Sequence, residues 1–259
     1  MNKIILFLFF SLIMSIVGIW YLAHKQSNKL SLPDNTLIVG TNAEYAPFSF
    51  MQNGAIAGFD IDLINEIAKR MNKSIELRDM PFDALIPGVQ TGMLQLIAGG
   101  ITPTPEREQL VAFTKPYITG DQLVIISPAG SPISSLEQLD NKKVAVNEGY
   151  TADYFMSKVQ GPELVRFASP IELFMALDSK RIDAAVAAHN TITSFINHYG
   201  KEKFSIAPIP NTTDEYALAI SKKHEQLLEP IQQALDAMDA DGTLEKLKHK
   251  WGLGKNGHE

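Results

Sequence analysis

Residues 97–107, IAGGITPTPER, place an arginine five residues after a threonine and just beyond a pair of glycines. The guanidinium of Arg107 is a planar fork that can bind a carboxylate through two parallel hydrogen bonds, and Thr102 adds a hydroxyl. Gly99 and Gly100 would let a ligand approach the backbone closely, and N–H groups at the start of a following helix favour an anion. The types and spacing of these residues therefore fit a binding site for a small anion.

The same segment also has an interpretation without a ligand. Pro103 and Pro105 are well placed to start a helix, in which case Arg107 would be solvated on its first turns. The spacing alone does not decide between a turn that starts a helix and a site that binds an anion.

Composition narrows the functional classes. The chain has 259 residues and a net charge of −6, and it contains no run of five basic residues, so recognition of nucleic acid is not expected. The absence of cysteine from the sequence excludes disulfides, thiolate metal sites and a cysteine nucleophile. No cofactor or metal is expected, because the sequence carries no motif for either. With 45% apolar residues, the chain can bury the core of one large domain or of two lobes.

Residues 1–29 form an export segment. A short basic start is followed by a charge-free apolar run of twenty residues, 4–23, and then by a polar stretch. The run is long for a cleaved signal peptide and long enough to span a bilayer, and Tyr21 stands where a cleavage site would need a small residue. A cleaved signal peptide and a retained N-terminal membrane anchor both stay open, and either places the body of the protein outside the cytoplasmic membrane.

The elements that must position the anion site alternate between strand-like and helix-like patterns. Residues 59–71 have apolar side chains at helical spacing with Asp60 as the expected cap, and Ser134 and Glu137 form the pattern of a capping box. Further helices are expected at 82–89, 153–158, 170–177 and 227–238, with a last one ending near residue 251. Strands are expected at 37–40, 75–77, 94–98, 122–126, 143–146, 165–167, 184–187 and 216–220.

This alternation predicts an α/β fold with two lobes, each a mostly parallel sheet flanked by helices. Lobe 1 is expected to contain residues 36–120 and 215–253, and lobe 2 residues 121–214, with hinge strands between them. Ligands of open α/β sheets bind at the carboxyl ends of the strands, so the expected site is a cleft between the lobes.

Several segments, in this order and spacing, resemble the polar amino-acid-binding proteins of bacterial ABC transporters. The main ones are GTNAEYAPFSF at 40–50, GFDIDL at 58–63, FDALIP at 82–87 and AGGITPTPER at 98–107. The resemblance covers about residues 36–253. It implies a monomeric periplasmic receptor with the two-lobed periplasmic-binding-protein fold, similar to arginine-, lysine- and glutamine-binding proteins. Such a receptor closes on a small solute and delivers it to an ABC permease in the inner membrane.

The resemblance implies roles for residues on both lobes. Arg107 and Thr102 would hold the carboxylate of the ligand from lobe 1. The turn from Asn147 to Thr151 would close on it from lobe 2, with Thr151 as a second contact to the carboxylate. From its position alone, Thr151 could equally be a plain helix N-cap.

The side-chain compartment of the ligand is implied in the same way. Tyr45 and Phe82 match the aromatic walls that sandwich the ligand's side chain, where a guanidinium or an alkyl stem would stack favourably. Asn42 matches a position at which many members that bind basic side chains or glutamine carry an acid. An amide there still accepts hydrogen bonds from a guanidinium but supplies less charge bias.

Ala188 departs from the pattern of the family. Members usually carry an acid at this position, and that acid binds the α-ammonium group of the ligand. Because burying an ammonium without a partner is costly, another group must do this work or the ligand is not a standard α-amino acid. Glu148, Asp214 and His189 are the alternatives that the sequence offers.

We therefore expect a binding protein without enzymatic activity that delivers a polar, basic, arginine-like amino acid by hinged closure. One alternative is a periplasmic enzyme of the cyclohexadienyl dehydratase type, for which Glu148, Tyr150 and His189 are the candidate acids and bases. The other alternative is a ligand-sensing module that signals through a membrane partner.

Overall fold

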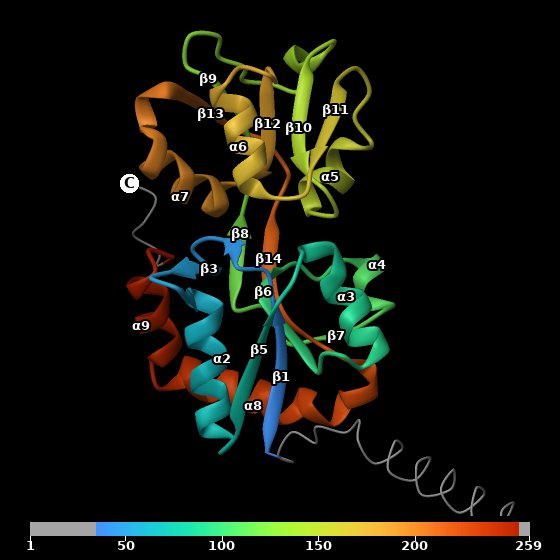
Figure 1. Ribbon diagram of the computed structural model, residues 1–259, viewed down its shortest axis with the longest axis vertical. Helices are drawn as coiled ribbons and strands as arrows, with labels where there is room; N and C mark the ends of the chain where they lie inside the picture. The colour runs from blue at the N-terminus through green and yellow to red at the C-terminus, as the bar shows by residue number, and fades with distance from the viewer. Residues whose placement is uncertain (1–34, 254–259) are drawn as a thin grey trace, which may run out of the picture. The chain divides into compact units, whose positions relative to one another are not determined.

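The structure, a computed structural model, describes residues 35–253, without the side chains of residues 197–199. The predicted export segment, residues 1–29, lies outside the described residues. Residues 37–253 belong to one compact unit. Two separate sheets, each covered by helices, make up most of this unit (Figure 1).

The first sheet has six strands in the order β5-β1-β6-β14-β7, with β8 paired to β14. These strands are β1 (Thr36–Thr41), β5 (Ser74–Asp79), β6 (Leu96–Ile101), β7 (Ala112–Phe113), β8 (Ile118–Asp121) and β14 (Asp214–Ile220). β1 and β6 are parallel, with Val39 opposite Leu96, whereas β14 returns antiparallel to β6. A small antiparallel sheet stands beside it, made of β2 (Glu44–Tyr45), β3 (Ser49–Gln52) and β4 (Ala55–Ala57).

Helices cover both faces of the first sheet (Figure 1). They are α2 (Phe59–Arg70), α3 (Phe82–Thr91), α8 (Leu228–Ala240) and α9 (Thr243–Lys250), with the short α4 (Pro105–Glu108) and the 3₁₀ turn η3 (Lys222–Leu227). The apolar faces of α2, α8 and α9 share one buried cluster with Leu37 and Val39 of β1. Helix α3 packs on the opposite face through Leu85 and Val89. The helical spacing seen in the sequence therefore fills a core on each side of the sheet.

The second sheet has five strands in the order β11-β10-β12-β9-β13. They are β9 (Leu123–Pro128), β10 (Lys143–Asn147), β11 (Glu163–Phe167), β12 (Ala184–Ala188) and β13 (Phe204–Pro208). Its helices are α5 (Thr151–Met156), α6 (Pro170–Asp178) and α7 (His189–Tyr199), with the 3₁₀ turns η1 (Glu137–Leu139) and η2 (Lys201–Lys203). One buried cluster lies under α5 and a second under α6 and α7.

Two antiparallel strands, β8 and β14, carry the chain between the sheets (Figure 1). β8 ends at Asp121, two residues before β9 begins, and β14 begins at Asp214, after β13. Asp121 and Asp214 lie directly opposite each other in the register of this pair. The connection between the sheets therefore places two acids side by side.

Two of the predicted helix caps are wrong. Helix α2 has Gly58 as its N-cap with no side-chain hydrogen bond, because the carboxylate of Asp60 accepts from the backbone N–H of Gly100 instead. The capping box at Ser134 and Glu137 does not form either. Only the short 3₁₀ turn η1 forms in this segment, without a side-chain cap, and the backbone N–H and the hydroxyl of Ser134 both bond to Gln138.

The sequence patterns also missed elements, namely helix α7 and strand β13 of the second sheet and the small sheet of β2, β3 and β4. Helix α7 begins at His189 without a side-chain cap, so it lacks the start signal on which the prediction of helices depends. Within residues 35–253, no helix is long and apolar enough to cross a membrane.

Candidate functional site

Arg107 lies buried at the corner where β6 gives way to α4. Thr104 is the N-cap of this helix and accepts a hydrogen bond from the backbone N–H of Arg107, so the prolines do start a helix, as predicted. The Arg107 side chain is nevertheless only 5% exposed, which excludes the interpretation in which it is solvated. Its Nη1 donates to the carbonyl of Thr102 and its Nη2 to the carbonyl of Gly149, both at 2.9 Å.

The guanidinium of Arg107 has no carboxylate partner among residues 35–253. Burial lowers its pKa, but an arginine side chain stays charged in a protein, so this is a buried positive charge. Its Cζ lies 5.3 Å from the centroid of the Phe82 ring, a cation–π contact. Two neutral carbonyls and one ring leave the charge uncompensated, which suits a site for an anion.

Of the two glycines of this corner, Gly100 is required by the packing of the protein itself, whereas a side chain at Gly99 would meet only an ordinary contact. Gly100 has a φ of +62°, and a Cβ at this position would collide with the ring of Tyr45. A Cβ at Gly99 would lie 3.4 Å from the hydroxyl of Thr41. Thr102 is 8% exposed, and its hydroxyl has no hydrogen-bond partner in the described part of the chain.

Asp60 holds the backbone of this corner through a hydrogen bond to Gly100. Its carboxylate is fully buried and accepts the N–H of Gly100. Burial raises the pKa of Asp60 to about 7, although the nearby Tyr117 hydroxyl and the N–H groups of Gly100 and Gly99 act in the opposite direction. Asp60 is therefore a buried acid that holds the backbone of this corner.

The second sheet contributes the turn between β10 and α5. Gly149 has a φ of +74°, its N–H donates to Asp153 at 3.1 Å, and its carbonyl receives the hydrogen bond from Arg107. The N-cap of α5 is Tyr150, so the interpretation of Thr151 as a plain N-cap is wrong. The Thr151 hydroxyl instead donates to Oδ2 of Asp214 at 2.6 Å.

Tyr150 occupies the space between the predicted aromatic walls. Its ring centroid lies 4.4 Å from that of Phe82 and 5.5 Å from that of Tyr45. Burial raises the pKa of Tyr150 well above its ordinary value, so the phenol stays protonated and donates to Oδ1 of Asn42 at 3.4 Å. The amide nitrogen of Asn42 donates to the carbonyl of Met80 at 3.2 Å.

Tyr150 thus touches three of the predicted site residues, although the sequence suggested it only as a candidate acid or base. The signal that could have found it is a large aromatic residue directly after the glycine of a turn that closes on the ligand.

The acidic end of the site lies on the connecting strands. Asp214 is 5% exposed and Asp121 is 4% exposed, and neither forms an ion pair with a lysine or an arginine among residues 35–253. Burial raises the pKa of Asp214 to about 6, and the neighbouring Asp121 raises it further, while the Thr151 hydroxyl and Arg107 lower it. The structure thus brings together Thr151 and Asp214, which lie 63 residues apart in the chain.

Ala188 and Asn147 line a small cavity that also contains Tyr150 and Thr151. Its lining residues are Tyr45, Asn147, Tyr150, Thr151, Ala152, Val186, Ala187, Ala188 and Thr191. Asn147 is buried, and its amide donates to the carbonyl of Phe167 at 3.3 Å. The wall that Ala187 and Ala188 form carries no charge.

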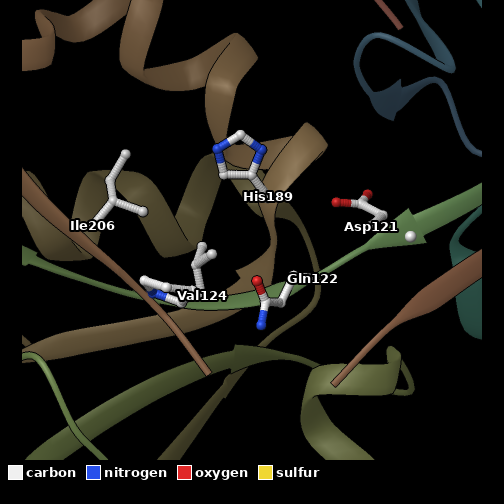
Figure 2. Close-up of a pocket in the computed structure, with 7 residues that line it drawn as sticks. Asp121, Gln122, Val124, His189 and Ile206 are labelled. Atoms are coloured by element: carbon white, nitrogen blue, oxygen red, sulfur yellow. The ribbon is translucent and has the colours of Figure 1, made fainter. Parts of the chain in front are cut away.

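A second cavity, of about 470 Å³, lies beside the end of β8 that contains Asp121 (Figure 2). Its lining differs from that of the small cavity. The lining residues are Gly120, Asp121, Gln122, Val124, His189, Ile206 and Pro208. His189 therefore does not line the cavity of Tyr150 and Ala188. Glu148, the remaining candidate acid, is exposed. The three candidate acids and bases of an enzyme are thus not brought together.

Comparison with known proteins agrees with this geometry. Residues 37–254 match the family of bacterial extracellular solute-binding proteins, family 3. A probable histidine-binding protein of Neisseria gonorrhoeae is 30% identical over 225 residues, which cover 85% of this chain and 84% of the relative. The arginine-binding extracellular protein of Bacillus subtilis is 31% identical over 223 residues, which cover 85% of this chain and 87% of the relative.

A solved structure of an ancestral arginine-binding protein bound to arginine superposes with a TM-score of 0.78 at 35% identity. The match covers 84% of this chain and 98% of the ancestral protein. The fold class predicted from the sequence, a two-lobed α/β binding protein, is confirmed by this similarity. The chain belongs to the bacterial extracellular solute-binding proteins, family 3.

Proposed function

We propose that this solute-binding protein takes up a polar amino acid with a basic, arginine-like side chain and delivers it to an ABC permease. The observation that carries the proposal is the buried guanidinium of Arg107, which has no carboxylate partner among residues 35–253. Such a group is suited to the carboxylate of a ligand. The relatives are described as arginine-binding or probable histidine-binding proteins, which supports a basic side chain.

Binding exchanges contacts within the protein for contacts with the ligand. The carboxylate takes the donors of Arg107, with the Thr102 hydroxyl beside it, and displaces the carbonyl of Gly149. The ligand's side chain takes the place of the Tyr150 ring against Phe82. A ligand can shift the open and closed populations only through contacts that differ between the two forms.

The lobes of this mechanism are residues 36–120 with 215–253 and residues 121–214, and they rotate about β8 and β14. The protein works as a monomer in the periplasm, and residues 1–29 either leave as a signal peptide or tether it to the inner membrane. No catalysis is expected, since Glu148 is exposed and His189 lines the other cavity.

A thermal-shift screen tests the proposal with the twenty amino acids, ornithine, citrulline and small carboxylates. We expect arginine or a close relative to raise the melting temperature in a dose-dependent way. Agmatine, which is arginine without its carboxylate, should have no effect. Stabilisation by agmatine equal to that by arginine would contradict the carboxylate anchor, and turnover of prephenate or arogenate would favour the enzyme instead.

A further inference from the structure

Asp214 is a buried acid of which only one oxygen is engaged by the protein. It is 5% exposed, and its Oδ2 accepts the hydroxyl of Thr151 at 2.6 Å. Its Oδ1 accepts no hydrogen bond within residues 35–253, and no lysine or arginine of this range forms an ion pair with it. A buried carboxylate is unfavourable without a cation or several donors, so a cationic donor at Oδ1 would stabilise it.

The neighbouring acid, Asp121, differs from Asp214 in its hydrogen bonds, although the two lie directly opposite each other in the strand register. Oδ2 of Asp121 accepts the hydroxyl of Tyr216 at 2.6 Å, and its Oδ1 accepts the backbone N–H of Asn190 at 3.0 Å. Both oxygens of Asp121 are thus engaged by the protein. Of the two acids, Asp214 is the one with a carboxylate oxygen that accepts no hydrogen bond within residues 35–253.

An independent observation points to a ligand at the same place. The hydroxyl of Thr191 is buried, in a residue that is 2% exposed. It lies near the phenol of Tyr45, but no group among residues 35–253 meets it with hydrogen-bond geometry. Thr191 lines the small cavity together with Thr151, whose hydroxyl bonds to Asp214. Ala187 and Ala188 supply the charge-free wall of this cavity. A buried hydroxyl without a partner is costly, so a polar group of a ligand would satisfy it.

We propose that Asp214 is the anchor for the α-ammonium group of the ligand, with the hydroxyls of Thr151 and Thr191 as the polar groups beside it. This inference rests on the proposed function, because only an amino acid held through its carboxylate at Arg107 requires a second anchor for an ammonium. An ammonium carries three donors, which matches one open carboxylate oxygen and two hydroxyls. An amino-acid ligand is then compatible with alanine at position 188.

The test compares amino acids with analogues that lack only the α-amino group. The pairs are arginine with 5-guanidinopentanoate, glutamine with glutaramate, and histidine with imidazolepropionate, measured by titration calorimetry. The full-length protein should prefer the amino acid of its best pair by about 30-fold or more. In Asp214→Asn this preference should fall to within about threefold, while the affinity for the des-amino acid stays unchanged. The amide still accepts the Thr151 hydrogen bond, so a merely structural role would survive this change.

Asp121→Asn is the matched control, because it changes the opposite acid in the same conservative way. We expect it to keep the preference for the amino acid, since the protein already uses both oxygens of Asp121. The inference is overturned if Asp214→Asn keeps the preference, or if Asp121→Asn removes it instead. Equal binding of both members of a pair by the unaltered protein overturns this inference alone. Binding of none of the six compounds overturns the proposed function as well.

Discussion

The two ends of the site carry opposite buried charges that do not pair with each other. At one end, Arg107 donates only to the carbonyls of Thr102 and Gly149. At the other end, Asp214 accepts only from a hydroxyl, and no ion pair joins the two within residues 35–253. Each charge loses hydration on burial and recovers little of it from the protein. A zwitterion with its charges in the opposite order would compensate both at once.

The two ends also differ in what holds them in place. The positive end is built within one corner, where Gly100 packs under Tyr45 and bonds to the buried Asp60. The acidic end joins strands from the two halves of the chain, and Thr151 completes it from the second sheet. The positive end is therefore set by local packing, and the acidic end depends on how the sheets approach.

Removal of the positive charge should have the largest effect. We expect Arg107→Met to weaken binding of the best amino acid at least about 100-fold, because the ligand carboxylate would face a desolvated pocket without its charged donor. Titration calorimetry measures the loss. Arg107→Lys keeps the charge but loses the two-donor fork, so it should bind with intermediate affinity. If Arg107→Met binds the amino acid with an affinity within threefold of that of the unaltered protein, the buried positive charge is not an anchor for the ligand.

A methyl group beneath the positive end tests its local support. Gly100→Ala requires an alanine at a φ of +62° and pushes its Cβ into the Tyr45 ring. We expect it to lower the free energy of unfolding by about 3 kcal/mol, measured by urea titration. Gly120→Ala is the matched control, because its φ is +82° but nothing lies within 4 Å of the added Cβ. Equal losses in the two variants would show that only backbone strain matters at Gly100.

The acid beneath the positive end should make stability depend on pH. The pKa of Asp60 rises from 3.8 to about 7 on folding, so its ionised form destabilises the native state above pH 7. This destabilisation is lost progressively as the pH falls from 7 towards 3.8, and below 3.8 the carboxyl is protonated in both states. From pH 8 to pH 5 we expect Asp60 to add about 2 kcal/mol to the free energy of unfolding.

Urea titrations at the two pH values compare this change between the unaltered protein and Asp60→Asn. The variant should lack the part of the pH dependence that Asp60 contributes. An unchanged difference between pH 8 and pH 5 in Asp60→Asn would assign the pH dependence to the acids of the other end.

The smallest effect should come from removing the Tyr150 ring, which packs against Phe82 and Tyr45. Tyr150→Ala removes a ring that contacts Phe82 and Tyr45, and with it a competitor for the space of the ligand's side chain. We expect the affinity for the best amino acid to rise about fivefold, as calorimetry would show. Tyr154→Ala is the control, because Tyr154 lies on the same helix but is 53% exposed. A loss of affinity in Tyr150→Ala would make Tyr150 a wall of the pocket instead.

The sequence predicted the positive end better than the acidic end. Residues 97–107 contain the strand end, the glycines, the helix start and Arg107 within one short segment, so local rules could find them. The sequence left Glu148, Asp214 and His189 as alternatives, since Asp214 becomes distinctive only when Thr151 lies beside it. Tyr150 was missed as a site residue for the same reason, because Phe82 and Tyr45 are distant in the chain.

The sequence by itself determined the alternation of strands and helices, the family and the presence of an arginine shortly after β6. These depend on periodicity and on neighbours within a few residues. The tertiary structure alone decided that Arg107 is buried without a carboxylate partner among residues 35–253, and that one oxygen of Asp214 accepts no hydrogen bond within this range. Burial and pairing depend on which distant segments meet, and a buried charge acquires its chemistry from those neighbours and from the loss of water.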